Sequence, residues 1–136
     1  MDYLTPAERS QQMSLVRSEN TKPEMAVRRM VHRMGFRYRL HVKDLPGHPD
    51  LVFPGRRKII FIHGCFWRGH RCRAGMNRPA SNVTYWTKKL DRTRVRDRGN
   101  IRLLGRLGWD VLVLWECQLG RASLPRRVAA FLTARR

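Results

Sequence analysis

Apolar and polar positions alternate with a period of two in several stretches, which is the pattern of β-strands. The clearest run, KIIFIH, covers residues 58–63 and ends on His63. A short apolar run covers residues 51–53, and residues 36–42 alternate in the same way. The most apolar run, WDVLVLW at residues 109–115, predicts a central and buried strand.

Other stretches repeat apolar residues every three to four positions, which predicts amphipathic helices. We expect helices over residues 5–17, 23–34, from 83 to about 107, and 124–133. Asn20 or Thr21 can cap the second helix, and Gly35 can end it. Gly99 predicts a kink or break in the third helix. Strands and helices in this order indicate an α/β protein, and the length of 136 residues predicts one domain over residues 1–136.

The two strands at residues 51–53 and 58–63 are joined by Pro54, Gly55 and two arginines, so we expect an antiparallel hairpin. In a hairpin the start of the first strand lies beside the end of the second, which places Asp50 near His63. The Pro-Asp pair followed by a strand resembles the PD-(D/E)xK nuclease core. The second acid of that core is missing here, and His63 replaces its lysine.

Asp50 offers the hard oxygen ligand that Mg²⁺ prefers, and the backbone carbonyl of Ile62 can supply another from the neighbouring strand. Phosphate oxygens of a substrate would complete the coordination shell. His63 would then take a proton from the attacking water or give one to the leaving oxygen. The alternative is that His63 has a purely structural role.

Four soft ligands occur as Cys65, His70, Cys72 and Cys117, and together they form the Cys3His set that zinc binds as a tetrahedron. All four positions of such a site are filled by protein, so the zinc would be structural. Three cysteines suit a metal in a reducing compartment better than a disulfide framework. Ordinary buried cysteines are the alternative.

The net charge of +19 predicts a polyanionic partner. Residues 66–79 carry four arginines and no acid, and residues 86–106 carry eight basic and two acidic residues. A general codon bias toward arginine would not by itself produce this clustering. No run of 18 apolar residues and no secretion signal are present, so we expect a cytoplasmic protein with no membrane contact.

Phe66 and Trp67 are adjacent in a basic loop, and such a pair suits insertion between bases of a duplex. Packing around the cysteine loop is the alternative. Lys88 and Lys89 lie on the charged side of the third helix and are candidate DNA contacts. Met13, on the N-terminal arm of residues 1–20, has packing as its ordinary explanation, and the helix dipole alone would explain Glu24.

Four ordered blocks of the chain are similar to the very-short-patch repair endonucleases. The blocks are TKPE at residues 21–24, LPGHPD at 45–50, HGCFW with a following H-x-C at 63–72, and LGWDVLVLWEC at 107–117. The resemblance implies a restriction-endonuclease-like mixed sheet flanked by helices, with a zinc-stapled loop. It implies a bacterial, nucleoid-associated enzyme that nicks DNA 5′ to the T of a T:G mismatch left by deamination of 5-methylcytosine.

The resemblance also implies roles for individual residues. Asp50 and the Ile62 carbonyl would hold Mg²⁺, His63 would be catalytic, and Glu24 would be the acid that supports it. Structural zinc would be held by Cys65, His70, Cys72 and Cys117. The intercalating wedge would consist of Met13, Phe66 and Trp67, with Trp86 near the mismatch. The enzyme would act as a monomer on duplex DNA, with mismatch-repair proteins as further partners.

One position departs from the family pattern. Arg68 follows the Phe-Trp pair where the family often has a second histidine, and a guanidinium can hold a phosphate but cannot shuttle a proton. We therefore expect His63 alone to transfer the proton. Two other functions remain open at this point: a zinc-containing DNA-binding module with a decayed nuclease site, and a nuclease with a different mismatch or sequence target.

Overall fold

Four strands form one mixed sheet in the part of the chain that the computed structural model describes, namely residues 21–65, 72 and 83–134. The strands follow the order β1-β2-β3-β4 across the sheet. The pairs β1–β2 and β2–β3 are antiparallel, and β3–β4 is parallel. Their bounds are Arg39–Leu40 for β1, Leu51–Phe53 for β2, Lys58–His63 for β3 and Asp110–Trp115 for β4.

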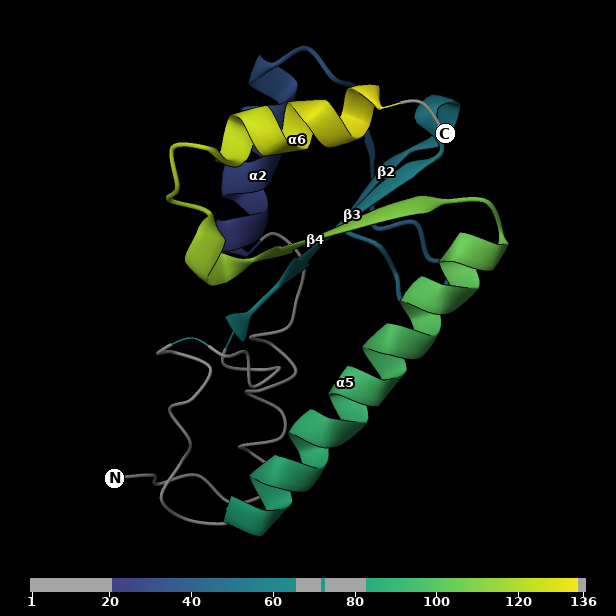
Figure 1. Ribbon diagram of the computed structural model, residues 1–136, viewed down its shortest axis with the longest axis vertical. Helices are drawn as coiled ribbons and strands as arrows, with labels where there is room; N and C mark the ends of the chain where they lie inside the picture. The colour runs from purple at the N-terminus through teal and green to yellow at the C-terminus, as the bar shows by residue number, and fades with distance from the viewer. Residues whose placement is uncertain (1–20, 66–71, 73–82, 135–136) are drawn as a thin grey trace.

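Three helices cover the two faces of this sheet (Figure 1). Helices α2 and α6 lie on one face, and the long helix α5 lies on the other. Single-turn 3-10 helices follow β2 and β4. The bounds are Lys22–Arg33 for α2, Val83–Arg106 for α5, Leu124–Thr133 for α6, Pro54–Arg56 for η1 and Glu116–Gln118 for η2.

Alternation along the strands divides the buried side chains between two hydrophobic clusters. Leu51, Phe53 and Ile60 point toward α2 and α6, where they pack with Val31 and Val128. The intervening side chains of the strands, Val52, Ile59 and Phe61, point the other way. They pack with Leu104 of α5 and with Trp109, which follows that helix. Both faces of β2 and β3 are therefore buried, which fixes the register of this hairpin.

Several predictions from the sequence are confirmed. Helix α2 has Thr21 as its N-cap, with the Thr21 Oγ1 accepting a hydrogen bond from the Glu24 N–H at 3.4 Å. Gly35 follows the helix with a φ of 91°, a conformation that glycine adopts without strain. Helix α6 occupies the predicted residues, and β2 and β3 form the predicted antiparallel hairpin. The helix predicted over residues 5–17 lies outside the described residues.

Other predictions are wrong. Helix α5 continues through Gly99 without a break, because the propensity cost of one glycine, about 1 kcal/mol, is small beside the packing of the helix. Strand β4 stands at the end of the strand order rather than in the centre, and most of its residues are half-buried. Only two residues of the predicted strand 36–42 form β1, since the left-handed backbone of His41, with a φ of 49°, ends the extended conformation.

No helix in the described part of the chain combines the length and the apolar character that crossing a bilayer requires.

Candidate active site

Three strands converge at Asp50, the residue directly before β2. Leu51 pairs with Leu40 on one side and with Ile60 on the other, so Asp50 has a strand on each side of it. Its side-chain Oδ2 accepts a hydrogen bond of 2.7 Å from the backbone N–H of Ile62. A bond this short to a carboxylate is charge-assisted and restrains the side chain. The Asp50 carboxylate is thus fixed against β3, beside the residue that precedes His63.

His63 ends β3 and is only 4% exposed. Its ring contacts two aromatic side chains, with ring centroids 5.7 Å from Phe61 and 5.1 Å from Trp115. Trp115 is its partner in the parallel register with β4, so the same pairing that builds the sheet also orients the imidazole. The strands thereby bring Asp50 and His63 to the same end of the β2–β3 hairpin.

A second carboxylate reaches Asp50 from helix α2. The ligand atoms of Glu24, His41 and Asp50 all lie within 4.8 Å of one another. Glu24 is 3% exposed, and its Oε1 lies 3.0 Å from His41 Nε2 and 3.2 Å from Arg28 Nη2. Arg28 Nη2 also lies 2.8 Å from His41 Nε2. The second carboxylate near Asp50 therefore comes from α2 and not from β3.

Sequence reasoning missed two members of this group, Arg28 and His41. The spacing of four residues between Glu24 and Arg28 is the spacing of ion pairs on a helix, so that contact could have been found. His41 carried no such signal. It lies opposite Asp50 only because the β1–β2 register continues one residue past Leu40, where the His41 N–H donates a long, 3.5 Å bond to the Asp50 carbonyl.

The donor atoms at this place fit a hard divalent cation. Two carboxylates within 4.8 Å of each other supply oxygen ligands, and oxygen is what Mg²⁺ prefers. Asp50 and the Ile62 carbonyl, which belongs to the strand that Asp50 contacts, would hold such an ion, with the Glu24 carboxylate near it.

The three cysteines form a second group. Their Sγ atoms all lie within 4.8 Å of one another, and the Cys117 N–H donates a 3.4 Å bond to Cys65 Sγ. Burial raises the pKa of the Cys65 thiol to about 12, with the Cys72 and Cys117 thiols adding to the rise and the Cys117 N–H opposing it. A bound cation would instead favour the thiolate, so three sulfur donors at this spacing fit zinc. His70, the predicted fourth ligand, lies outside the described residues.

The described part of the predicted DNA-contacting surface lies on α5. Trp86 is buried, 7% exposed, with Lys89 Nζ 5.5 Å from its ring centroid. Its neighbour Tyr85 is 54% exposed and offers aromatic surface to the solvent instead. Lys88 is exposed and Lys89 half-buried. Four predicted contacts fall outside the described residues, namely Met13, Phe66, Trp67 and Arg68.

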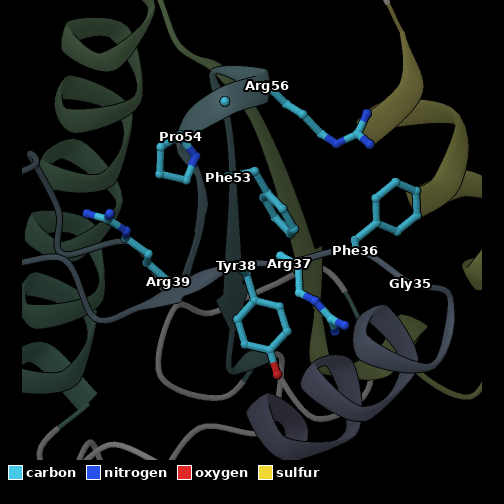
Figure 2. A pocket seen from close by; sticks show the side chains of 9 residues that line it. Gly35, Phe36, Arg37, Tyr38, Arg39, Phe53, Pro54 and Arg56 are labelled. Atoms are coloured by element: carbon cyan, nitrogen blue, oxygen red, sulfur yellow. The ribbon is translucent and has the colours of Figure 1, made fainter.

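A hollow of about 520 Å³ lies at the other end of the hairpin, where β2 runs into η1. Figure 2 shows the rings of Phe36, Tyr38 and Phe53 around it, with three arginines at its margin. The Arg56 guanidinium stacks 4.9 Å from the Phe36 ring centroid and donates a 3.2 Å bond to the Leu132 carbonyl. Among the described residues that line this hollow there is no carboxylate, histidine or cysteine, so the acid–base and metal-ligating groups belong to the Asp50 end.

Known proteins resemble this chain over most of its length. Residues 1–74 match the family described as DNA mismatch endonuclease Vsr. The chain is 51% identical to the Type II nicking enzyme V.XorIIP of Xanthomonas oryzae pv. oryzae over 118 residues, which is 87% of this chain and 86% of that enzyme. It is 40% identical to the Type II nicking enzyme V.NmeAIP of Neisseria meningitidis over 125 residues, 92% of this chain and 89% of the relative.

It is also 38% identical to the DNA mismatch endonuclease Vsr of Escherichia coli over 124 residues, 90% of this chain and 79% of the relative. The family implies a restriction-endonuclease-like fold, and the mixed sheet flanked by helices agrees with it. A family match over more than half the chain, together with these identities, shows that the chain belongs to the Vsr family and is a DNA endonuclease, a hydrolase.

Proposed function

We propose that this endonuclease nicks one DNA strand 5′ to the T of a T:G mismatch, in a reaction that depends on Mg²⁺. The observation that carries the proposal is the group formed by Asp50 with Glu24, placed beside the residue before His63. Two relatives named nicking enzymes and one named a mismatch endonuclease support cleavage of a single strand at a mismatch.

Each residue of the site has a distinct role in this proposal. Asp50 and the Ile62 carbonyl hold Mg²⁺, with Glu24 contributing the second carboxylate near it. When bound, the ion polarises the phosphoryl oxygen and neutralises charge that develops during the reaction. The Ile62 N–H keeps Asp50 in one orientation, because rotation of the carboxylate would break the 2.7 Å bond.

Hydrolysis forms a bond between water oxygen and phosphorus and breaks the bond from phosphorus to the leaving sugar oxygen. His63 takes the proton from the attacking water or gives one to the leaving oxygen. The contacts of its ring with Phe61 and Trp115 restrict its motion, which favours transfer in one geometry. Glu24 lies close to Arg28, His41 and Asp50, and we propose that it is the acid that supports His63 from the Asp50 side of the site.

Structural zinc on Cys65, His70, Cys72 and Cys117 would tie the loop after β3 to the end of β4. The three described thiols already meet there, which supports this assignment. Phe66 and Trp67 follow Cys65 directly in the chain, and we propose that they and Met13 form the wedge at the mismatch. Arg68, Lys88 and Lys89 would contact phosphates, and Trp86 would lie near the mismatch.

The decisive experiment is a nicking assay on three duplexes that share one sequence and carry a T:G, a G:G or a paired position at one site. We expect one nick, 5′ to the T, in the T:G duplex with Mg²⁺ and none after chelation. Metal analysis of the same protein should find one zinc per chain.

Two results would contradict the proposal. Tight binding to the T:G duplex with no Mg²⁺-dependent nick would indicate a DNA-binding module that has lost catalysis. Equal cleavage of the paired or G:G duplex would indicate a nuclease with another target.

A further inference from the structure

We propose that His41 and Arg28 are positioning residues that hold Glu24 next to Asp50, and that this clamp sets the affinity of the site for its divalent cation. The proposal rests on the proposed function in assigning the cation to Asp50. It extends that function to two residues that the proposed reaction does not use.

The clamp consists of three side-chain atoms that lie close to one another. Glu24 Oε1 lies 3.0 Å from His41 Nε2 and 3.2 Å from Arg28 Nη2, and the two nitrogen atoms lie 2.8 Å from each other. The side chains of Glu24 and Arg28 are 4% and 10% exposed. All three side chains thus meet at one carboxylate oxygen with little access for water.

The members of the clamp come from different elements. Glu24 and Arg28 share α2, where a spacing of four residues places them on one side of the helix. His41 directly follows β1, and its backbone N–H contacts the Asp50 carbonyl. The clamp therefore joins α2 to the strands that carry Asp50.

Such a clamp offsets the repulsion between the two carboxylates of the site. Two carboxylates within 4.8 Å of each other repel in a poorly hydrated place, and Glu24 has other rotamers that would turn it away. The Arg28 guanidinium offsets this repulsion. His41 Nε2 accepts a hydrogen bond from Arg28 Nη2 at 2.8 Å and so keeps the guanidinium beside Glu24, which limits the rotamers. Because Glu24 Oε1 faces Arg28 Nη2 at 3.2 Å, the ion pair restricts the direction of the whole carboxylate. Outer contacts of this kind change metal affinity by about 10–100-fold in known metal sites.

The experiment measures Mn²⁺ binding without DNA, by titration calorimetry on the full chain loaded with zinc. His41→Asn is the main variant, because asparagine tolerates the left-handed backbone of this position but is too short to reach Arg28 Nη2. We expect its Mn²⁺ affinity to fall about tenfold. His41→Gln, whose amide oxygen can accept from Arg28 Nη2, should recover most of the affinity.

Matched controls come from the same helix. His32→Asn and Arg29→Ala change exposed residues of the same types and should leave Mn²⁺ affinity unchanged. Arg28→Ala should weaken binding as His41→Asn does. If Arg28→Ala unfolds the protein, the comparison of His41→Asn with His41→Gln decides alone, since the His41 side chain is 18% exposed and less deeply packed.

Three outcomes would overturn the proposal. The first is unchanged Mn²⁺ affinity in His41→Asn. The second is equal weakening in His41→Asn and His41→Gln. The third is a directly bound imidazole nitrogen in the electron spin echo spectrum of Mn²⁺ that disappears in His41→Asn, which would make His41 a ligand rather than a positioning residue.

Failure of the proposed function would look different. A wild-type protein that does not nick the T:G duplex, yet shows the expected order of Mn²⁺ affinities, would reject the activity and keep the clamp. Normal nicking with no effect of His41→Asn on Mn²⁺ affinity or on kcat would reject the clamp and keep the activity.

Discussion

His63 illustrates how a single residue can be both part of the core and part of the chemistry. Its ring is 4% exposed and packs edge-on against Trp115, at a centroid distance of 5.1 Å. A buried imidazole has few accessible rotamers, so its ring nitrogens point in defined directions. Removing the ring therefore removes the proposed proton-transfer group and also leaves a space beside Phe61 and Trp115.

We predict that His63→Ala lowers kcat for nicking the T:G duplex by about 10²–10⁴-fold, the usual contribution of a general acid–base group. The dissociation constant for the duplex should stay nearly unchanged, as gel-shift titration would show. His32→Ala, a change at an exposed histidine, is the control. Because the His63 site is buried, the melting temperature of each variant must be measured too. Nicking by a folded His63→Ala protein at near wild-type rate would rule out the assigned role.

The Cys65 thiol gives a prediction on pH. Its pKa rises from 9.0 to about 12 on folding in the metal-free protein, mainly through burial. A raised acid pKa means that the neutral thiol stabilises the fold below pH 9, and that this stabilisation is lost as the pH rises toward 12. Between pH 8.5 and about 11, the melting temperature of the metal-free wild type should therefore fall more than that of metal-free Cys65→Ala. A constant difference over this range would show that Cys65 does not titrate as described.

At the scale of elements, the turn before β2 decides where Asp50 lies. Gly47 has a φ of 80°, and a Cβ placed there would lie 3.2 Å from the Asn100 side chain of α5 and 3.2 Å from the Phe61 ring of β3. A side chain at this turn would therefore strain the backbone and crowd both the helix and the strand.

We predict that Gly47→Ala destabilises the protein by about 1–3 kcal/mol, through backbone strain and the two close contacts. The rate of nicking should fall as well, because a displacement of the backbone at residue 47 also displaces Asp50, three residues later in the chain. Gly55→Ala is the matched control: Gly55 has no positive φ, and its added Cβ would meet nothing within 4 Å. Chemical denaturation of both variants tests the difference, and equal stabilities would contradict the steric explanation.

The elements that sequence reasoning located are those that a local signal specifies. Thr21 and Gly35 delimit α2, Pro125 starts α6, and the two arginines after Gly55 separate the strands of the hairpin. The position of β4 in the sheet depends on pairing across 52 residues, from Lys58 to Asp110, and no local pattern carries that information. The sequence of an apolar strand has the same pattern whether the strand is buried by neighbouring strands or by helices.

The candidate site divides in the same way. Asp50 could be placed beside the end of β3 because the hairpin is a local structure, and the bond from the Ile62 N–H is its consequence. The association of Asp50 with Glu24 and His41 requires α2 and β1 to dock on that hairpin. Sequence spacing could suggest Glu24 only through resemblance to a family, and it offered no indication of His41.

At the scale of the whole molecule, charge is the main feature. Helix α5 carries eight basic and two acidic residues over 24 residues, a length of about 36 Å at 1.5 Å per residue. One turn of duplex DNA has about the same length. Most of these basic side chains are exposed, including Arg92, Arg96, Arg98 and Arg102. The helix thus presents a cationic edge long enough to follow one turn of a phosphate backbone.

If this edge contacts phosphates, it adds affinity without adding sequence or mismatch specificity, because phosphates are the same in every duplex. We therefore predict that the double variant Arg92→Glu/Arg96→Glu weakens binding to the T:G and the paired duplex by the same factor. The slope of log K against log salt should become less steep by about 0.9 for each phosphate that the protein no longer neutralises. The variant Arg121→Glu/Arg126→Glu, at two exposed residues outside α5, controls for the same change in net charge. A weakening confined to the T:G duplex would instead place this part of α5 at the mismatch itself, whereas equal weakening in the double variant and the control would leave only a general effect of charge.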